Sequence, residues 1–179
     1  MDMDKDLAIK ALQKMDEILL EEGFSKVTLI VGGGGSMVLA HGFRGLTGDL
    51  DAIPLNLEFD DIKSAMTKVA IQLKLKPDWI NPYFSAYTIY LPPDSNSRMS
   101  SEFAGKVLTV QCLGAEDIMI MKLMAGRAKD VNHIKHLLNT VKGLNLSLVD
   151  DRLHELLKLY PELAKRAIER LDDFAEDYE

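Results

Sequence analysis

Two aspartates separated by one residue, Asp49 and Asp51, are the side chains of this sequence best suited to hold a metal ion. The segment 49–53 alternates polar and apolar residues and ends at Pro54, a pattern typical of a β-strand. Both carboxylates should therefore point to the same face of a sheet. Divalent cations relieve the repulsion between two such charges, typically Mg²⁺ when phosphate oxygens complete its shell of ligands.

Four glycines, Gly32 to Gly35, precede this pair and follow the β-branched, apolar segment 27–31, which we predict to be a strand. Glycines let a phosphate approach the backbone, and the N–H groups at the start of a following helix attract anions. Ser36 is expected to cap that helix, predicted over 37–41. Strand, glycine turn, helix and paired aspartates together indicate a site for a metal ion and a triphosphate.

Other interpretations of the same residues stay open. The glycines could form a purely structural turn, and the aspartates could be charges at a strand edge. A strand followed by Gly32-x-Gly34 also suggests dinucleotide binding, but Met37 stands where that motif needs a third glycine, and the chain opens with a helix. A P-loop is excluded, because the lysine that motif requires does not follow the glycines.

The remaining periodicity predicts an α+β fold, with a mixed sheet flanked by helices and a helical C-terminal third. We expect one domain, with an α/β core over 1–142 and a helical extension over 143–179. Trp79 is expected to anchor a loop, and Cys112 to be buried and inert. Helices are predicted over 7–20, from 60 or 61 to 73, over 115–125, over 129–141, and from 150 into the acidic tail with a break near Pro161. Two further strands are predicted, over 86–91 and 106–112, and these two could pair.

Composition narrows the classes of function. The net charge of −7 makes nonspecific coating of DNA an unsuitable role. The chain has one cysteine and no pattern of a signal peptide, and no stretch is apolar enough for a membrane helix, so we expect a cytoplasmic protein.

The stretch from Gly34 to Asp51 resembles the nucleotidyltransferase superfamily, which has the polymerase-beta-like fold. Its signature is a hydrophobic residue, Gly-Gly or Gly-Ser, a short spacer and Asp-x-Asp or Asp-x-Glu, matched here by Gly35-Ser36 and Asp49-Leu-Asp51. The stretch is more closely similar to minimal nucleotidyltransferases of bacteria and archaea, including relatives of the AbiEii-type toxins. Further matching positions are Arg44, Thr47, Trp79-Ile-Asn81 and the run from Lys122 to Asp130, so the likeness spans about residues 28–138.

This resemblance implies that Asp49 and Asp51 hold two Mg²⁺ ions and that the substrate is a nucleoside triphosphate (NTP). An acceptor, such as an RNA end, a protein hydroxyl or a small molecule, would then take the nucleoside monophosphate (NMP) while pyrophosphate leaves. A role in a toxin–antitoxin or defence system is also implied. The nucleotide and phosphate contacts implied are Gly34, Gly35, Ser36, Arg44, Thr47, Lys122, Arg127 and Lys129.

One departure from the family pattern bears on catalysis. Active members carry a third carboxylate on a later strand, and Gln111 occupies the equivalent place here. An amide can neither bind a metal as an anion nor take a proton, so catalysis would need another carboxylate in this place. Glu102, Glu116 and Asp117 are the candidates to replace it in space. The alternatives are a catalytically silent binding protein that acts through a protein partner, with the helical residues from about 150 as a partner surface, and a helix-rich regulatory domain with a structural glycine turn.

Overall fold

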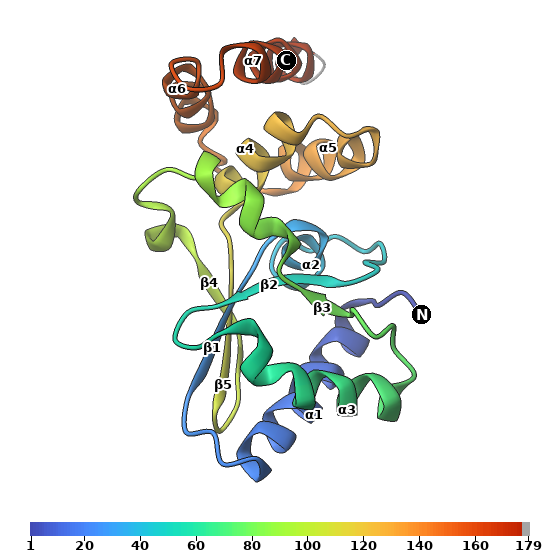
Figure 1. Cartoon of the computed structure of the whole chain (residues 1–179). Coiled ribbons are helices and arrows are strands. Elements are labelled where there is room, and N and C mark those ends of the chain that lie inside the picture. The colour runs from blue at the N-terminus through green and yellow to red at the C-terminus, as the bar shows by residue number, and fades with distance from the viewer. Residues whose placement is uncertain (177–179) are drawn as a thin grey trace. The chain divides into compact units, whose positions relative to one another are not determined.

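The computed structural model describes residues 1–176, and the chain forms two compact units. The sheet unit comprises Met1–Ser85 and Met99–Leu113, and the helical unit comprises Ala86–Arg98 and Gly114–Glu179. The fold is α+β, as the sequence predicts, with helices at the C-terminal end (Figure 1). No helix within residues 1–176 has the length and apolar character needed to cross a membrane.

The sheet unit is built on one mixed sheet with the strand order β3-β2-β1-β5-β4. The apolar strand β1 lies at its centre, antiparallel to β2 and parallel to β5, and β4 pairs antiparallel with β5. The strands are β1 (Val27–Val31), β2 (Leu50–Pro54), β3 (Ile80–Asn81), β4 (Ser100–Ala104) and β5 (Leu108–Cys112).

Helices α1 (Lys5–Glu21) and α3 (Lys63–Leu73) lie side by side and pack on one face of this sheet (Figure 1). Apolar residues at helical spacing in α1, such as Leu12 and Met15, are fully buried against alternate residues of the strands. Trp79 is also fully buried, and its indole N–H donates to the carbonyl of Met66 at 3.0 Å, which confirms its role as a loop anchor. The opposite face of the sheet carries the half-buried residues of the strands.

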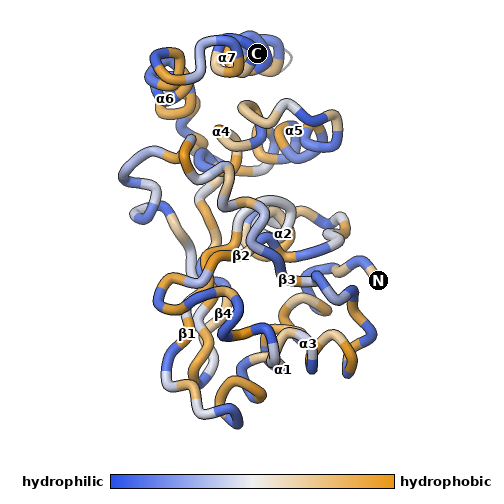
Figure 2. Tube along the Cα trace, in the orientation of Figure 1, coloured by the Kyte–Doolittle hydropathy of each residue, from blue (hydrophilic) through white to orange (hydrophobic). Residues whose placement is uncertain are grey.

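The helical unit is organised around α4 (Ala115–Ala125), which is apolar and buried on almost every side. It packs against α5 (Val131–Thr140), α6 (Leu146–Leu156) and α7 (Pro161–Glu176). The last two helices alternate hydrophobic and hydrophilic residues along their length, as Figure 2 shows, because each buries only one stripe. The last three residues of the predicted C-terminal helix, 177–179, lie outside the described residues.

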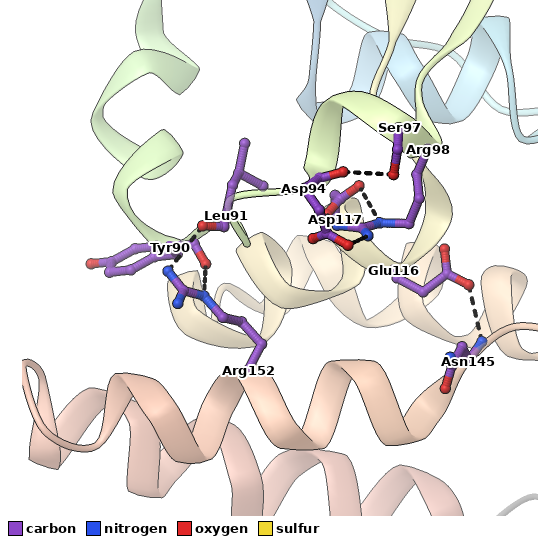
Figure 3. Close-up of polar contacts among 9 residues, drawn as sticks. All are labelled: Tyr90, Leu91, Asp94, Ser97, Arg98, Glu116, Asp117, Asn145 and Arg152. Atoms are coloured by element: carbon purple, nitrogen blue, oxygen red, sulfur yellow. Dashed lines mark hydrogen bonds and ion pairs between the residues drawn. The ribbon is translucent and has the colours of Figure 1, made fainter.

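Residues 86–98 belong to the helical unit because polar contacts hold them there (Figure 3). Arg98 donates two hydrogen bonds to the fully buried carboxylate of Asp117, at 3.0 and 2.8 Å. Arg152 donates to the carbonyls of Tyr90 and Leu91, both at 2.9 Å. Helix α4 packs with α5, α6 and α7, so the helical unit begins before residue 143.

Two local predictions are wrong. Segment 86–91 is not a strand but part of the 3₁₀ helix η2 (Tyr83–Tyr90), in which Tyr87 and Tyr90 contact each other edge to face. The β-branched and aromatic residues of this segment favour a strand. The carbonyls of Tyr90 and Leu91 instead accept hydrogen bonds from Arg152, and the strand that pairs with β5 is β4. Helix α2 (Gly33–Leu39) begins at Gly33, so Ser36 lies inside the helix and does not cap it.

An interaction that the sequence analysis did not anticipate joins α1 to the turn before β5. The buried carboxylate of Asp16 accepts hydrogen bonds from the backbone N–H groups of Lys106, Val107 and Leu108, at 2.7 to 2.9 Å. Burial opposes ionisation of Asp16, but these three donors outweigh it, so its pKa lies below the ordinary value.

We predict that Asp16→Asn lowers the free energy of unfolding by about 1–3 kcal/mol, because the amide places an NH₂ group against backbone donors. The pKa of Asp16 is depressed in the folded state, so its contribution is present above the unfolded pKa, about 3.9, and is lost as the pH falls through the folded pKa. Urea unfolding between pH 3 and 7 should show a weaker acid dependence for the variant. Glu21→Gln, at the exposed end of α1, is the control; an equal loss of stability in both variants would contradict the prediction.

Candidate functional site

The glycine turn after β1 packs directly on Asp51. Gly33 has a left-handed backbone with φ of +56°, and a Cβ built on it would lie 2.3 Å from Oδ2 of Asp51. The N–H of Gly32 donates to the carbonyl of Asp51 at 2.9 Å. Only glycine fits at position 33, because both the conformation and the space exclude a side chain.

Asp49 and Asp51 lie on one face of the strand, as the alternation predicts. Asp51 is in β2, and Asp49 immediately precedes that strand. Leu50 and Ala52 are buried in the core that α1 and α3 cover, so the two aspartates face the other side, where both are half-buried. The buried amide residue Asn81 pairs with Asp51 in the parallel register of β2 and β3, next to the carboxylates.

The loop before the aspartates is fixed by Thr47. Its hydroxyl donates to the carbonyl of Asp49 at 2.8 Å. A Cβ on Gly34 would lie 2.9 Å from the hydroxyl oxygen of Thr47. Its backbone exchanges two hydrogen bonds with Met3, at 2.7 and 2.9 Å. Thr47 therefore orders the loop, and the contribution of Met3 carried no signal in the sequence.

Gly35 and Ser36 lie on the inner side of helix α2. A Cβ on Gly35 would lie 2.8 Å from a methyl group of Leu50. The buried Ser36 hydroxyl donates to the carbonyl of Leu113 at 3.1 Å. Both residues allow α2 to pack closely on the sheet, while their role as phosphate contacts stays a prediction.

Two cationic side chains lie near the loop of the aspartates. Arg44 is exposed and lines a cavity of about 320 Å³ together with Asp4 and Asp6 at the start of α1. Lys76, which the sequence analysis did not single out, forms an ion pair with Asp2 at 2.7 Å. The hydrogen bond to Asp2 is the main cause of the raised pKa of Lys76, and the charge of Asp49 adds to it.

Gln111 shares the sheet face of the aspartates. It is paired with Ile30 across β1 and β5, and Ile30 is paired with Ile53 across β1 and β2. Paired residues of neighbouring strands point to one face, and Ile53 lies two residues beyond Asp51 on the same strand. The amide of Gln111 is thus two strands away from Asp51, on the side where a third carboxylate would face the pair.

The three carboxylates considered as replacements for Gln111 all have other partners. Asp117 is bound by Arg98, and Glu116 accepts a hydrogen bond from the backbone of Asn145 at 3.0 Å (Figure 3). Glu102 accepts a hydrogen bond from Ser100 and lies 3.7 Å from Lys5.

The predicted cationic contacts Lys122, Arg127 and Lys129 belong to the helical unit. Lys122 is buried, and its ammonium donates to Asp130 at 2.7 Å and to Nδ1 of His133 at 2.9 Å. Arg127 donates to the other oxygen of Asp130 at 2.6 Å, whereas Lys129 is exposed.

Burial opposes both charges of the central ion pair in this cluster. Burial alone would raise the pKa of Asp130, but the nearby His133 and the hydrogen bonds from Arg127 and Lys122 hold it below its ordinary value. Burial lowers the pKa of Lys122, against the attraction of Asp130. Lys122 therefore has a structural role in the helical unit, whatever its role toward phosphate.

The carboxylates around Asp51 fit a magnesium ion whose other ligands are phosphate oxygens and water. Mg²⁺ is commonly bound by one or two carboxylates plus substrate oxygens and water. Asp49 and Asp51 supply two carboxylates on one face, beside a glycine turn without side chains. No group of three or more acidic, histidine or cysteine residues suited to hold a metal ion occurs within residues 1–176.

We predict that Gly33→Ala destabilises the protein more than Gly42→Ala does. Both glycines have positive φ values, +56° and +65°, but a Cβ on Gly42 meets nothing within 4 Å. Gly42→Ala should therefore cost only the backbone strain, about 1–2 kcal/mol. Gly33→Ala adds an overlap with Asp51, worth roughly another 1–3 kcal/mol. Urea unfolding measures the difference, and equal losses in the two variants would refute the close packing on Asp51.

Comparison with known proteins assigns the family. No curated protein and no solved structure is significantly similar to the chain. One family model matches residues 8–179, which include the glycine turn, both aspartates and the helical unit. The chain belongs to this family, which is described as a nucleotidyltransferase of unknown function (DUF6036).

Proposed function

We propose that the protein is a Mg²⁺-dependent nucleotidyltransferase that moves an NMP from an NTP to an acceptor. The observation that carries this proposal is the contact between the glycine turn and Asp51. The backbone at Gly33 lies against the carboxylate with no side chain between them. A phosphate that reaches this turn would therefore also reach the carboxylate. Membership of a nucleotidyltransferase family supports the same reaction class.

Asp49 and Asp51 would hold the metal ions, in line with their shared face on β2. When bound, magnesium neutralises charge on the phosphates and orients the attacking and leaving oxygens. The chain itself contributes position. Thr47 fixes the carbonyl of Asp49, and Gly32 fixes that of Asp51, so both carboxylates are attached to backbone that is held by hydrogen bonds.

The acceptor would be a hydroxyl of an RNA end, of a protein or of a small molecule, because a nucleophilic oxygen must attack the α-phosphate. Its proton cannot go to Gln111, since an amide is not a base at neutral pH. A carboxylate of the aspartate pair or solvent would have to take it. The resemblance to AbiEii-type toxins extends the proposal to a toxin–antitoxin or defence system.

A catalytically silent binding protein is the second candidate, and Gln111 is the observation that favours it. Its amide occupies the face of the aspartates where a third carboxylate would serve as a metal ligand or base. Such a protein would bind a nucleotide without turnover and act through a protein partner. Robust NMP transfer to any acceptor would exclude this second candidate.

The test is calorimetric titration of the four NTPs with and without Mg²⁺, because binding requires no knowledge of the acceptor. We expect binding that needs the metal and that weakens at least roughly tenfold in Asp49→Asn/Asp51→Asn, which removes both charged ligands. Gln111→Glu should tighten the binding, because it adds an anion on the same face, whereas Gly33→Ala should weaken it.

Two controls match these variants. Asp60→Asn/Asp78→Asn removes two exposed carboxylates of the sheet unit, and Thr109→Glu adds a charge two residues from Gln111 on the same face of β5. Asp60→Asn/Asp78→Asn should leave both the affinity for NTP and its dependence on Mg²⁺ unchanged. Binding that survives unchanged in Asp49→Asn/Asp51→Asn, or no NTP binding by the wild type, would contradict the proposal.

A further inference from the structure

Tyr83 is an exposed aromatic residue near the aspartate pair, and the proposed reaction has so far assigned it no role. It is 67% exposed, whereas the other aromatic residues within residues 1–176 are buried or half-buried. Single exposed apolar residues are common on protein surfaces, so exposure alone indicates no function. What distinguishes Tyr83 is its place in the sheet unit, two residues after Asn81, which is paired with Asp51 across β2 and β3.

The backbone of Tyr83 lies on the sheet face of the aspartates. Residues paired across neighbouring strands point to one face, so the side chain of Asn81 shares the face of Asp51. Its Oδ1 accepts a hydrogen bond from the N–H of Tyr83 at 3.0 Å, so the chain turns onto that face. One strand spacing and two residues of chain keep the Cα atoms of Tyr83 and Asp51 within roughly 12 Å of each other.

Local constraints fix the backbone at Tyr83. The ring of Pro82 fixes the φ angle of the residue before it, and Asn81 holds its N–H group. The N–H of Ser85 donates to the carbonyl of Pro82 at 2.9 Å, which closes the first turn of η2. The aromatic ring is therefore attached to a backbone that is ordered before any ligand binds, which lowers the entropy lost on binding.

Phe84 ties the same segment to the glycine turn. It is only 3% exposed, and a Cβ on Gly32 would lie 2.8 Å from its ring. Successive residues of a 3₁₀ helix point about 120° apart, so Tyr83 cannot face the turn in the way that Phe84 does. The segment therefore holds one ring against the backbone of the turn and presents the next ring to solvent, at the edge of the candidate site.

We propose that Tyr83 is the stacking surface for the base of the NTP. This inference rests on the proposed function, because the base reaches Tyr83 only if the phosphates lie between the glycine turn and the aspartates. An aromatic ring offers a flat apolar face on which any of the four bases can stack. Stacking does not read the hydrogen-bonding groups of a base, so Tyr83 should raise the affinity for every NTP without selecting one of them.

Calorimetry of the full chain in Mg²⁺ with ATP, UTP and ribose 5-triphosphate, which lacks the base, tests the proposal. ATP and UTP should each bind the wild type at least about fivefold more tightly than ribose 5-triphosphate. Tyr83→Ala should remove this preference and leave the affinity for ribose 5-triphosphate unchanged, whereas Tyr83→Phe, which keeps the ring, should retain it. Stacking should also quench the fluorescence of 2-aminopurine riboside triphosphate on the wild type and on Tyr83→Phe, but not on Tyr83→Ala.

Ile71→Ala is the matched control, since Ile71 is exposed on α3, which covers the other face of the sheet. It should leave all three affinities unchanged, and thermal unfolding of each variant separates lost binding from lost folding. Equal affinity of the wild type for ATP and ribose 5-triphosphate, or equal weakening of both in Tyr83→Ala, would overturn this inference alone. Absence of NTP binding by the wild type would overturn the proposed function and this inference with it.

Discussion

The close approach of a side-chain-free turn to a carboxylate is the constraint on which the candidate site depends. Gly33 places its backbone against Asp51, and no residue with a Cβ can do so in that conformation. The neighbouring glycines serve the same packing, since Gly34 lies on the Thr47 hydroxyl and Gly35 on Leu50. Three of the four glycines, Gly33 to Gly35, each lie against a different residue of the segment 47–51, whereas Gly32 lies against the ring of Phe84.

The surrounding fold holds this corner in place from several directions. Strand β1 leads into the turn, and β2 carries Asp51, with Asp49 directly before it. The antiparallel register of the two strands brings the end of β1 to the start of β2. The backbone of Met3 pairs with Thr47, and Ser36 and His41 both contact the carbonyl of Leu113 after β5. Elements from several parts of the sheet unit therefore position the site. Such support keeps reacting groups in a fixed geometry.

Local patterns predicted most of the fold and the faces of its strands. Alternation in 49–53 placed Asp49 and Asp51 on one face, and helical periodicity predicted α4 over the same residues as observed. The pattern failed at 86–91, where contacts with Arg152 and Tyr160, far away in sequence, select a 3₁₀ helix. The interactions of Asp16 and Met3 could not be predicted, because their partners lie 90 and 44 residues away. Lys122 matched a family motif, but the sequence alone did not reveal that it is buried against Asp130.

Electron paramagnetic resonance of Mn²⁺, used in place of Mg²⁺, tests the central claim most directly. In the proposed site the aspartate pair would provide only part of a metal's ligands, so a bound triphosphate would have to supply others. The account predicts that Mn²⁺ becomes protein-bound only when an NTP is present, and that Asp49→Asn/Asp51→Asn abolishes this bound signal. A bound signal of equal strength without nucleotide, or in the double variant, would contradict the account.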